Sequence, residues 1–556
     1  MRWTHSTLLL LLFAGRYGCQ AQSAQMDLAG QVDKLFEKWN KPNSPGCALS
    51  VMKDGLIVYK RGYGMANLDH DIPITPSTVF HVASVSKQFT AASIVLLAHR
   101  GKLSIDDEVR KYIPELPDFG QRITIRHLIH HTSGLRDQWD LLGLAGWRYS
   151  LDLITDEDVL SVIARQRDLN FRPGERHLYC NTGYTLLAQI VKRVSGQSFR
   201  EFTSANIFVP LGMKNTHFRD DHAEIVKDMA YGYVPSADTF KLSITNFDTV
   251  GATSLLTTVE DLALWDENFY SPRVGGKELT DQMLQRGKLN SGEQLDYAFG
   301  LTLGKYKGLP TVDHGGSDAG YRSDLLRFPE QHFSVACLCN VSVNPSQLTR
   351  QVADIYLAKD LKPEPPKPEE PAVKLTEAQL AGKVGIYYNP DGDAIRKVVL
   401  RDGTLRAQIG SRSIELRPLS EVRFRPAGQA GEVHFEPAGA AAMRLISVPD
   451  SGAKATVYER AEEFKPAPAQ LQEYVGLYRS DEIEAAYRIG IQDGKLVIDR
   501  LKSKTVQLDP AIKDLFTSSE GSIRFTRNPQ SKVTGFVLNS GRILNFRFNK
   551  TGDNSP

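Results

Sequence analysis

A hydroxyl and an amine stand three residues apart, at Ser84 and Lys87, at the start of an apolar segment. Residues three positions apart share one face of a helix, so the two side chains become neighbours if this segment is helical. A serine hydroxyl is a weak nucleophile until a neighbouring group takes its proton, and burial lowers the pKa of a lysine so that it can be that group. The pair therefore predicts acyl transfer through a covalent serine intermediate.

The same Ser-x-x-Lys spacing recurs at Ser50/Lys53 and at Ser451/Lys454. The first pair lies in two expected strands around an Asp-Gly turn, and a three-residue offset in a strand puts side chains on opposite faces. The second pair follows a Pro-Asp step and is typical of a loop. Ser84 is followed by apolar helix formers that end at a glycine, which predicts a helix. We expect this helix to be central and buried.

Two further stretches carry side chains that could assist the serine. Tyr179 and Asn181 lie between an Arg-Pro-Gly step and a helical pattern, so they belong to a loop, where catalytic side chains are often presented. His314 stands at the end of an expected strand and is followed by Gly315 and Gly316. Glycines there let a substrate lie close against the backbone.

In combination these motifs resemble the serine β-lactamase and penicillin-binding-protein superfamily, over roughly residues 28–358. The resemblance is to its class C-like hydrolases: D-aminopeptidases, D-alanyl-D-alanine carboxypeptidases and esterases. It implies that Ser84 is the nucleophile, and that Lys87 and Tyr179 transfer protons. It further implies that Asn181 holds a substrate amide and that the backbone N–H groups of Ser84 and Ser317 form the oxyanion hole. Whether Lys87 or Tyr179 is the base stays open.

The third motif departs from the penicillinase pattern. Penicillinases of this superfamily usually carry Lys-Thr-Gly, whereas His314-Gly315-Gly316 resembles the form in D-aminopeptidases, some carboxypeptidases and esterases. A histidine can titrate near physiological pH, so recognition of a β-lactam carboxylate is put in doubt. We count His314 with the catalytic residues, and Gly315 and Gly316 with the substrate-binding ones. Cys180 also replaces the common serine of the second motif.

Histidines and cysteines give no metal or disulfide pattern. His127, His130 and His131 lack an accompanying carboxylate or cysteine constellation, and the resemblance makes them loop scaffolding. We therefore expect no metal and no cofactor. Cys337 and Cys339 share one face of an expected strand and are poorly placed to bond each other. We expect these two, with Cys47 and Cys180, to be small buried core residues without a disulfide framework.

The elements that must position these residues form an α/β (α+β) domain. An amphipathic helix at 28–39 and a hairpin precede the Ser84 helix, helical patterns dominate 105–211, and strands return at 297–303, 311–314 and 333–340. This order implies an antiparallel sheet assembled from both ends of the domain, flanked by helices, with a helical subdomain. At 556 residues the chain is too long for one core.

The C-terminal part repeats itself. Ala378 and Asp402 recur as Ala469 and Asp493 within matching stretches, both at an offset of 91 residues. Short alternating runs between turns predict small all-β barrels or sandwiches. The expected organisation is a signal peptide at 1–24, a β-lactamase-like hydrolase domain at 25–360, a Pro/Glu-rich linker at 361–374, and repeats at 375–463 and 464–556.

The N-terminal sequence and the charge balance indicate where the protein is located and which partners are unlikely. Residues 1–24 show a secretory signal pattern whose apolar core is too short for a stable transmembrane anchor. Lipidation of Cys19 is the less favoured reading, because the residues before it lack the small, apolar pattern of a lipoprotein signal. Sixty-seven basic against 65 acidic residues, a net charge of +2, argue against nucleic acid as a partner. The sequence leaves the oligomeric state open.

The leading hypothesis is an exported, periplasmic or secreted serine hydrolase acting on a small-molecule or peptide substrate. Its substrates would be small D-amino-acid peptides, amides or esters, cleaved through an acyl-enzyme intermediate. One alternative is a class C-like β-lactamase. Another is a non-catalytic, penicillin-binding-like sensor with the repeats as binding modules.

Overall fold

The computed structural model describes residues 27–362, 370–409, 412–438, 443–450, 454–500 and 502–552. The predicted signal peptide with Cys19, most of the predicted linker's Pro-rich core, and Ser451 lie outside these residues. The chain divides into two compact units. Unit 1 holds the described residues of Met1–Gly134, Tyr149–Ala164 and Phe171–Glu364, and unit 2 those of Leu135–Arg148, Arg165–Asn170 and Pro365–Pro556.

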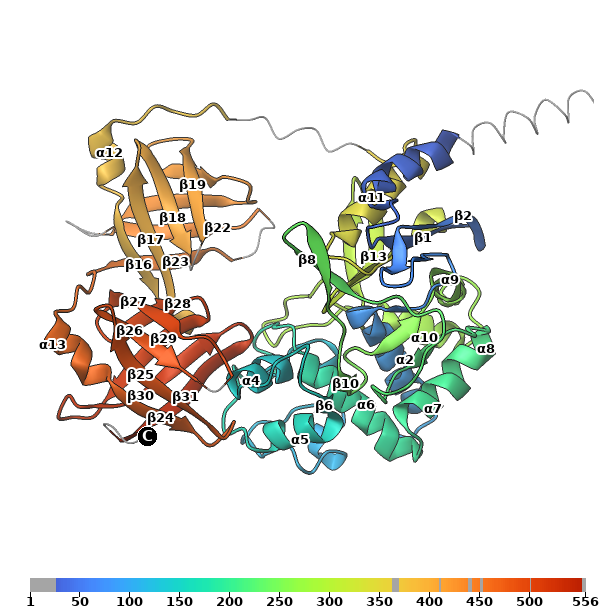
Figure 1. The fold of residues 1–556 in the computed structure, drawn as a ribbon, viewed down its shortest axis with the longest axis horizontal. Helices are drawn as coiled ribbons and strands as arrows, with labels where there is room; N and C mark the ends of the chain where they lie inside the picture. Colours follow the sequence, from blue (N-terminus) through green and yellow to red (C-terminus); the bar gives the residue numbers. More distant parts are fainter. Residues whose placement is uncertain are drawn as a thin grey trace, which may run out of the picture. The chain divides into compact units, whose positions relative to one another are not determined.

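Unit 1 is built on a six-stranded antiparallel sheet, of which Figure 1 labels β1, β2 and β13. The strand order is β12-β13-β14-β15-β1-β2. The N-terminal hairpin joins the late strands because β1 pairs with β15, with Cys47 opposite Cys339. The sheet is thus assembled from both ends of the domain, as the sequence predicts. Its strands are β1 (Cys47–Lys53), β2 (Leu56–Tyr63), β12 (Thr302–Tyr306), β13 (Leu309–Asp318), β14 (Tyr321–Phe328) and β15 (Phe333–Cys339).

The strand predicted at 297–303 begins late, at Thr302, because residue 300 forms a turn. Gly300 has a φ of +70°, and a Cβ there would lie 2.6 Å from the Lys87 carbonyl group. Only glycine allows this backbone conformation so close to the Ser84 helix.

Helices cover both faces of the sheet. The helix at 27–36 and α11 pack on one face, around a core that includes Phe36, Val335 and Val352. Helix α9 packs on the other face, where Ser50 Oγ donates to Val259 O at 3.1 Å. Helix α2 is buried from Ser86 through Leu97, so the expectation of a central Ser84 helix is confirmed. The helices of unit 1 are α2 (Ser86–His99), α3 (Ile125–Ile129), α5 (Asp156–Ala164), α6 (Asn181–Ser195), α7 (Phe199–Thr203), α8 (Val209–Leu211), α9 (Val259–Glu267), α10 (Gly276–Met283) and α11 (Pro345–Tyr356).

Short strands join the helical part of unit 1 to its loops. Strand β5 pairs with β11 immediately before the turn that carries Ser84. These strands are β3 (Met65–Asn67), β4 (Ile72–Pro73), β5 (Phe80–His81), β6 (Ile154–Thr155), β7 (His217–Phe218), β8 (Tyr233–Ser236), β9 (Thr239–Leu242), β10 (Phe247–Asp248) and β11 (Leu255–Thr257).

Unit 2 contains two closed eight-stranded barrels, which are the two predicted repeats. In both, a buried tyrosine on the first strand donates to a carbonyl four residues earlier: Tyr387 to Lys383 O at 2.9 Å and Tyr478 to Tyr474 O at 2.7 Å. The two tyrosines thus have the same packing role in both barrels. The first barrel has β16 (Gly385–Asn389), β17 (Ala394–Arg401), β18 (Thr404–Ile409), β19 (Arg412–Pro418), β20 (Arg423–Pro426), β21 (Glu432–Pro437), β22 (Met443–Val448) and β23 (Thr456–Ala461). The second has β24 (Gly476–Ser480), β25 (Ala485–Gln492), β26 (Lys495–Asp499), β27 (Val506–Ile512), β28 (Leu515–Ser518), β29 (Gly521–Arg527), β30 (Val533–Ser540) and β31 (Ile543–Gly552). Helices α12 (Glu377–Ala381) and α13 (Pro468–Leu471) precede the barrels at matching positions.

Two segments of unit 2 come from within residues 25–360 of the sequence. Leu135–Arg148, which contains α4 (Gln138–Leu144), and Arg165–Asn170 pack on the second barrel. Arg136 pairs with Glu482 of this barrel at 2.8 Å, and both side chains are almost fully buried. The backbone N–H of Leu544 donates to Asn170 Oδ1 at 2.7 Å.

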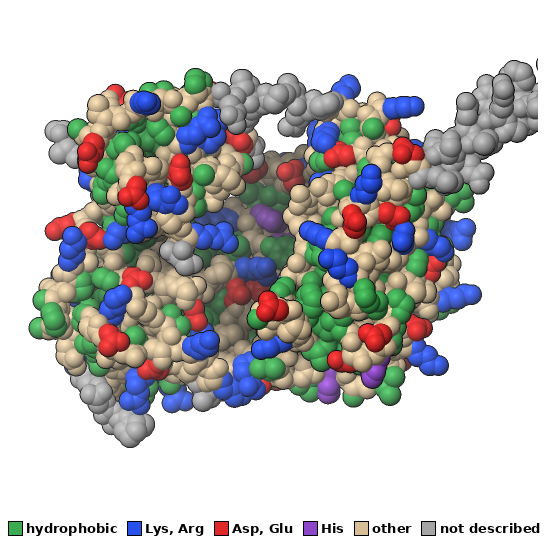
Figure 2. Space-filling view, turned by 45° about the horizontal axis from the view of Figure 1, so that its top comes forward, with side chains coloured by type: hydrophobic (Ala, Val, Ile, Leu, Met, Phe, Trp, Pro, Cys, Tyr) green, Lys and Arg blue, Asp and Glu red, His purple; other side chains and the backbone are tan. Residues whose placement is uncertain are grey.

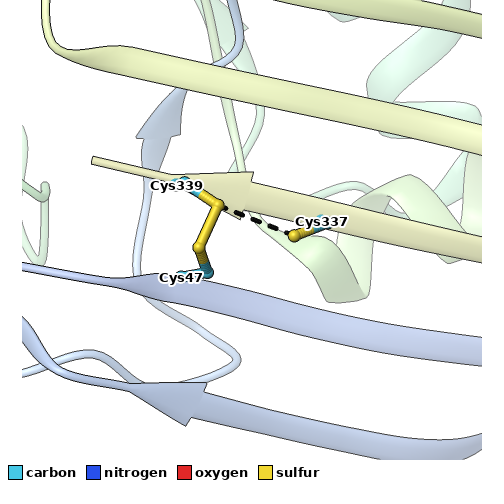
Figure 3. Close-up of side chains that lie close together, drawn as sticks. All are labelled: Cys47, Cys337 and Cys339. Atoms are coloured by element: carbon cyan, nitrogen blue, oxygen red, sulfur yellow. Dashed lines mark hydrogen bonds between the residues drawn. A yellow bond between two sulfur atoms is a disulfide. The ribbon is translucent and has the colours of Figure 1, made fainter. Parts of the chain in front are cut away.

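The cysteines correct one prediction. Cys47 and Cys339 form a disulfide bond, so they are not free core residues (Figure 3). The pairing of β1 with β15 brings together two residues that are 292 positions apart. Cys337 remains a buried thiol, with its Sγ 3.6 Å from the sulfur of Cys339, and Cys180 is also a buried thiol outside the disulfide bond.

The surface agrees with the balanced composition. Positive and negative side chains are interspersed over the face shown in Figure 2. Within the described residues, no helix has the length and apolar character needed to cross a membrane.

Candidate active site

Ser84 lies in the single turn η2 (Ala83–Val85), which leads directly into α2. Its side chain keeps partial access to solvent, while the flanking residues are buried. Ala83 has a φ of +49°, a left-handed conformation that is strained for a residue with a Cβ. The chain therefore presents the hydroxyl on a tight turn at the start of a rigid helix.

Lys87 is fully buried beneath this turn. Its Nζ donates to Ser84 Oγ at 3.0 Å, to Asn181 Oδ1 at 2.9 Å and to Ala252 O at 2.7 Å. Three oxygens match the three N–H donors of an ammonium group. The predicted pair thus shares one helix face, whereas the carbonyl of Ala252 could not be identified from any local sequence pattern.

Tyr179 and Asn181 stand where a loop enters α6. Asn181 is the first helical residue, and Tyr179 is half-buried, with its ring centroid 4.9 Å from Lys87 Nζ. His131 fixes this loop, because the backbone N–H of Cys180 donates to His131 Nδ1 at 3.0 Å. The ring centroids of His131 and Tyr179 lie 4.2 Å apart, so His131 also packs against the side chain of Tyr179.

The other two histidines of this stretch also make local contacts. His127 caps the start of α3 together with Thr124. His130 Nδ1 lies 3.0 Å from Arg126 O. Neither belongs to the clusters of described residues whose side chains converge closely enough to hold a metal ion.

His314 lies on β13 and is buried. Its Nε2 is 3.0 Å from the hydroxyl of Tyr297, and its Nδ1 is 2.6 Å from Gly315 O. Burial, with the charge of Lys87 nearby, lowers the pKa of His314 to about 4. The imidazole is therefore neutral at physiological pH. Tyr297 could not be identified from the sequence, because no motif in its neighbourhood points to a functional role.

The glycines after His314 differ in their surroundings. A Cβ at Gly316 would lie 2.3 Å from Val82 O and 2.3 Å from Ser323 Oγ, so only glycine fits there. At Gly315 the nearest atom would be 3.5 Å away, and the residue is exposed. Ser317 follows on the same strand, opposite Arg322.

A pocket of about 360 Å³ adjoins these residues. Its lining includes His177, Tyr179, Leu295, Asp296, Tyr297 and His314. The side chains are largely aromatic, and Asp296 is the charged group among the lining residues of the described chain. Asp296 also pairs with Arg286. The pocket thus offers an apolar wall and a carboxylate.

Comparison with known proteins agrees with this geometry. The chain is 29% identical to penicillin-binding protein 4* of Bacillus subtilis over 445 residues, which cover 77% of this chain and 98% of that protein. It is 28% identical to the D-aminopeptidase of Gluconobacter oxydans over 68% of this chain and 72% of that one. Among solved structures, the octameric penicillin-binding protein homologue from Pyrococcus abyssi superposes with a TM-score of 0.54 at 25% identity, covering 86% of this chain and 99% of that chain.

The Beta-lactamase family matches residues 32–358, which is more than half of the chain. This range contains Ser84, Lys87, Tyr179 and His314 in the order expected from the sequence. The chain therefore belongs to the Beta-lactamase family and is a serine hydrolase.

Proposed function

We propose that this protein hydrolyses amides, small peptides or esters of D-amino acids through an acyl-enzyme on Ser84. The observation that carries the proposal is the buried histidine His314, which stands where penicillinases of this superfamily usually have a lysine and whose pKa is lowered to about 4 by burial. Without a cation at this position, the site favours substrates that carry no carboxylate next to the scissile bond. Amino-acid amides and esters meet that condition.

The charge of the pocket supports the same class of substrate. Asp296 lines it, and no lysine or arginine is among its described lining residues. The aromatic wall suits a substrate with an apolar side chain, and Asp296, which also pairs with Arg286, places a carboxylate beside that wall. The similarity to a D-aminopeptidase over 68% of the chain is consistent with this assignment.

The proton transfers follow from the contacts of Lys87. In the ammonium form Lys87 donates to Ser84 Oγ. Once Lys87 has lost a proton to its surroundings, the hydroxyl of Ser84 can donate to it instead, and the serine oxygen attacks the carbonyl carbon. The proton then passes to the leaving amine or alcohol through Lys87 and Tyr179. Backbone N–H groups of Ser84 and Ser317 would stabilise the oxyanion.

We further propose that the protein is exported and acts outside the cytoplasm. The support is the signal pattern of residues 1–24 together with the Cys47–Cys339 disulfide, a bond that persists mainly in oxidising compartments. Fractionation of cells that express the full chain, with N-terminal sequencing of the mature protein, tests this. An unprocessed protein confined to the cytoplasm would contradict it.

A substrate panel tests the catalytic proposal. D- and L-alanine p-nitroanilides, the matching methyl esters and a chromogenic cephalosporin are offered to the wild type and to Ser84→Ala. We expect turnover of D-amides or esters, and no turnover by a folded Ser84→Ala variant, because the nucleophile is gone. Intact mass after fluorophosphonate treatment should show one adduct on the wild type and none on the variant. Efficient cephalosporin hydrolysis without amide or ester hydrolysis would favour the β-lactamase alternative.

A further inference from the structure

A buried histidine–aspartate pair lies beside the two backbone segments that carry Ser84 and Ser317. His81 Nε2 is 2.9 Å from Asp318 Oδ2, and the two side chains are 3% and 2% exposed. His81 ends β5, three residues before Ser84, and Asp318 ends β13, directly after Ser317. The two partners are 237 positions apart, so only the fold brings them together.

The carboxylate of Asp318 accepts hydrogen bonds from separate parts of unit 1. Besides His81, Thr253 Oγ1 donates to Oδ2 at 2.7 Å and the Tyr149 hydroxyl donates to Oδ1 at 2.5 Å. Burial alone would raise the pKa of Asp318, but His81 and these donors hold it below its usual range. An ionised carboxylate with these hydrogen bonds holds the segments that carry the donors in place, because moving any donor leaves a buried charge less well solvated.

The segments that meet at Asp318 also touch around the serine turn. The N–H of Val82 donates to Leu255 O at 3.0 Å, and Ser323 Oγ donates to Val82 O at 2.7 Å. Gly316 packs against Val82 so closely that no side chain would fit. The strand that carries Ser317 thus packs directly against the segment that leads into the Ser84 turn. A shift of either segment changes the distance between their two N–H groups.

We propose that the His81–Asp318 pair positions the oxyanion hole formed by the backbone N–H groups of Ser84 and Ser317. This inference rests on the function proposed above, in which Ser84 is the nucleophile. An oxyanion donor stabilises the transition state only at hydrogen-bond distance from the developing charge, so a small displacement weakens it strongly. Both side chains are buried, so His81 and Asp318 act as positioning residues.

The alternative is a pair that only stabilises the fold. A buried, hydrogen-bonded polar pair can often be replaced by apolar groups of similar volume with little loss of stability, so stability alone is a weak reason for one at this place. The two explanations differ in what they affect. Loss of a purely structural pair changes only the free energy of unfolding. Loss of a positioning pair also changes how strongly the hydrolysis rate depends on the carbonyl oxygen of the substrate.

The test uses p-nitrophenyl acetate and its thiono analogue, in which sulfur replaces the carbonyl oxygen. Sulfur accepts hydrogen bonds poorly, so hydrolysis of the thiono ester depends less on the oxyanion hole. In the full-length His81→Leu variant we expect kcat for the oxygen ester to fall about 100-fold, with KM little changed and a much smaller fall for the thiono ester. His81→Gln, whose amide N–H can still donate to Asp318, should recover most of the oxygen-to-thiono rate ratio.

His332→Leu is the matched control. It removes another histidine–carboxylate pair, between His332 Nε2 and Glu267 Oε2 at 2.9 Å, and should leave the rate ratio unchanged. Equal losses for both esters in a folded His81→Leu variant would overturn the proposal. If circular dichroism shows that His81→Leu does not fold, Thr253→Val serves instead, since it removes one donor to Asp318. An unchanged ratio there also overturns it. A wild type that hydrolyses neither ester and takes no fluorophosphonate overturns the proposed function itself.

Discussion

Two buried cations, one in each unit, differ in the groups that accept their hydrogen bonds. Lys87 of unit 1 donates to three neutral oxygens, those of Ser84, Asn181 and Ala252. Arg136 of unit 2 donates to the Glu482 carboxylate at 2.8 Å, and the two side chains are 0% and 6% exposed. The two side chains are both buried. Among these hydrogen bonds, only those of Arg136 include a carboxylate as the acceptor.

This difference is consistent with a structural role for Arg136 and with the proposed catalytic role of Lys87. A carboxylate partner stabilises the charged form of a cation strongly, and arginine keeps its proton at any physiological pH. Neutral acceptors stabilise the charged form less, so the proton of a buried lysine can be moved more readily. The site around Lys87 is therefore suited to proton transfer, and the site around Arg136 to holding segments together.

Exchanging the two residue types gives the largest expected effect. Lys87→Arg keeps the positive charge but cannot supply a base, so we expect the kcat of hydrolysis to fall about 1,000-fold or more. The reverse change, Arg136→Lys, should leave kcat of the folded protein within about threefold. Steady-state kinetics on whichever D-amino-acid ester the wild type cleaves measure both. Near wild-type turnover in Lys87→Arg would show that this amine is not needed as a base.

Breaking the buried ion pair gives the next largest effect. Arg136→Met leaves Glu482 buried without its cation, which typically costs about 3–5 kcal/mol of stability. Replacing both partners, as Arg136→Met with Glu482→Leu, should cost much less, because no charge is then left buried. Urea denaturation followed by tyrosine fluorescence gives the free energies of the double-mutant cycle. Additive effects of the two changes would mean that the pair is not coupled.

The first barrel offers the matched control for this cycle. At the offset of 91 residues, the position of Glu482 corresponds to Asp391, which is exposed in the same turn of the first barrel. Asp391→Asn should change the unfolding free energy by no more than about 0.5 kcal/mol. A loss as large as that of Arg136→Met would imply that the turn itself, rather than the buried pair, determines stability.

The pH dependence of stability gives the smallest effect of this set. The pKa of His314 is about 4 in the folded protein, below the usual value near 6.5 of an unfolded histidine. Between these values the unfolded state binds more protons, so stability falls as the pH is lowered through this range. In His314→Asn, the loss of unfolding free energy on lowering the pH should be smaller by up to roughly 3 kcal/mol. Urea titrations at pH 7.0, 5.5 and 4.5 compare the two proteins, and parallel curves would contradict the assignment.

Much of the site could be predicted because its signals are local. The placement of Ser84 beside Lys87 follows from a helix-forming segment and a spacing of three residues. The loop before α6 follows from an Arg-Pro-Gly step, and the two barrels from a repeat of 91 residues. The cysteine prediction was wrong for Cys47 and Cys339, because no local pattern shows that β1 lies beside β15.

The sequence by itself determined the chemical groups, their order along the chain and the local elements that carry them. The tertiary structure alone decided which distant groups meet: Tyr297 with His314, His81 with Asp318, and Arg136 with Glu482. The physical reason is the range of the interactions involved. Helix spacing and turn chemistry act over a few residues, whereas these pairs depend on the pairing of strands and the closure of barrels over long stretches of chain. Burial, which lowers the pKa of His314, and the hydrogen bonds that keep Asp318 ionised likewise arise only from the assembled fold.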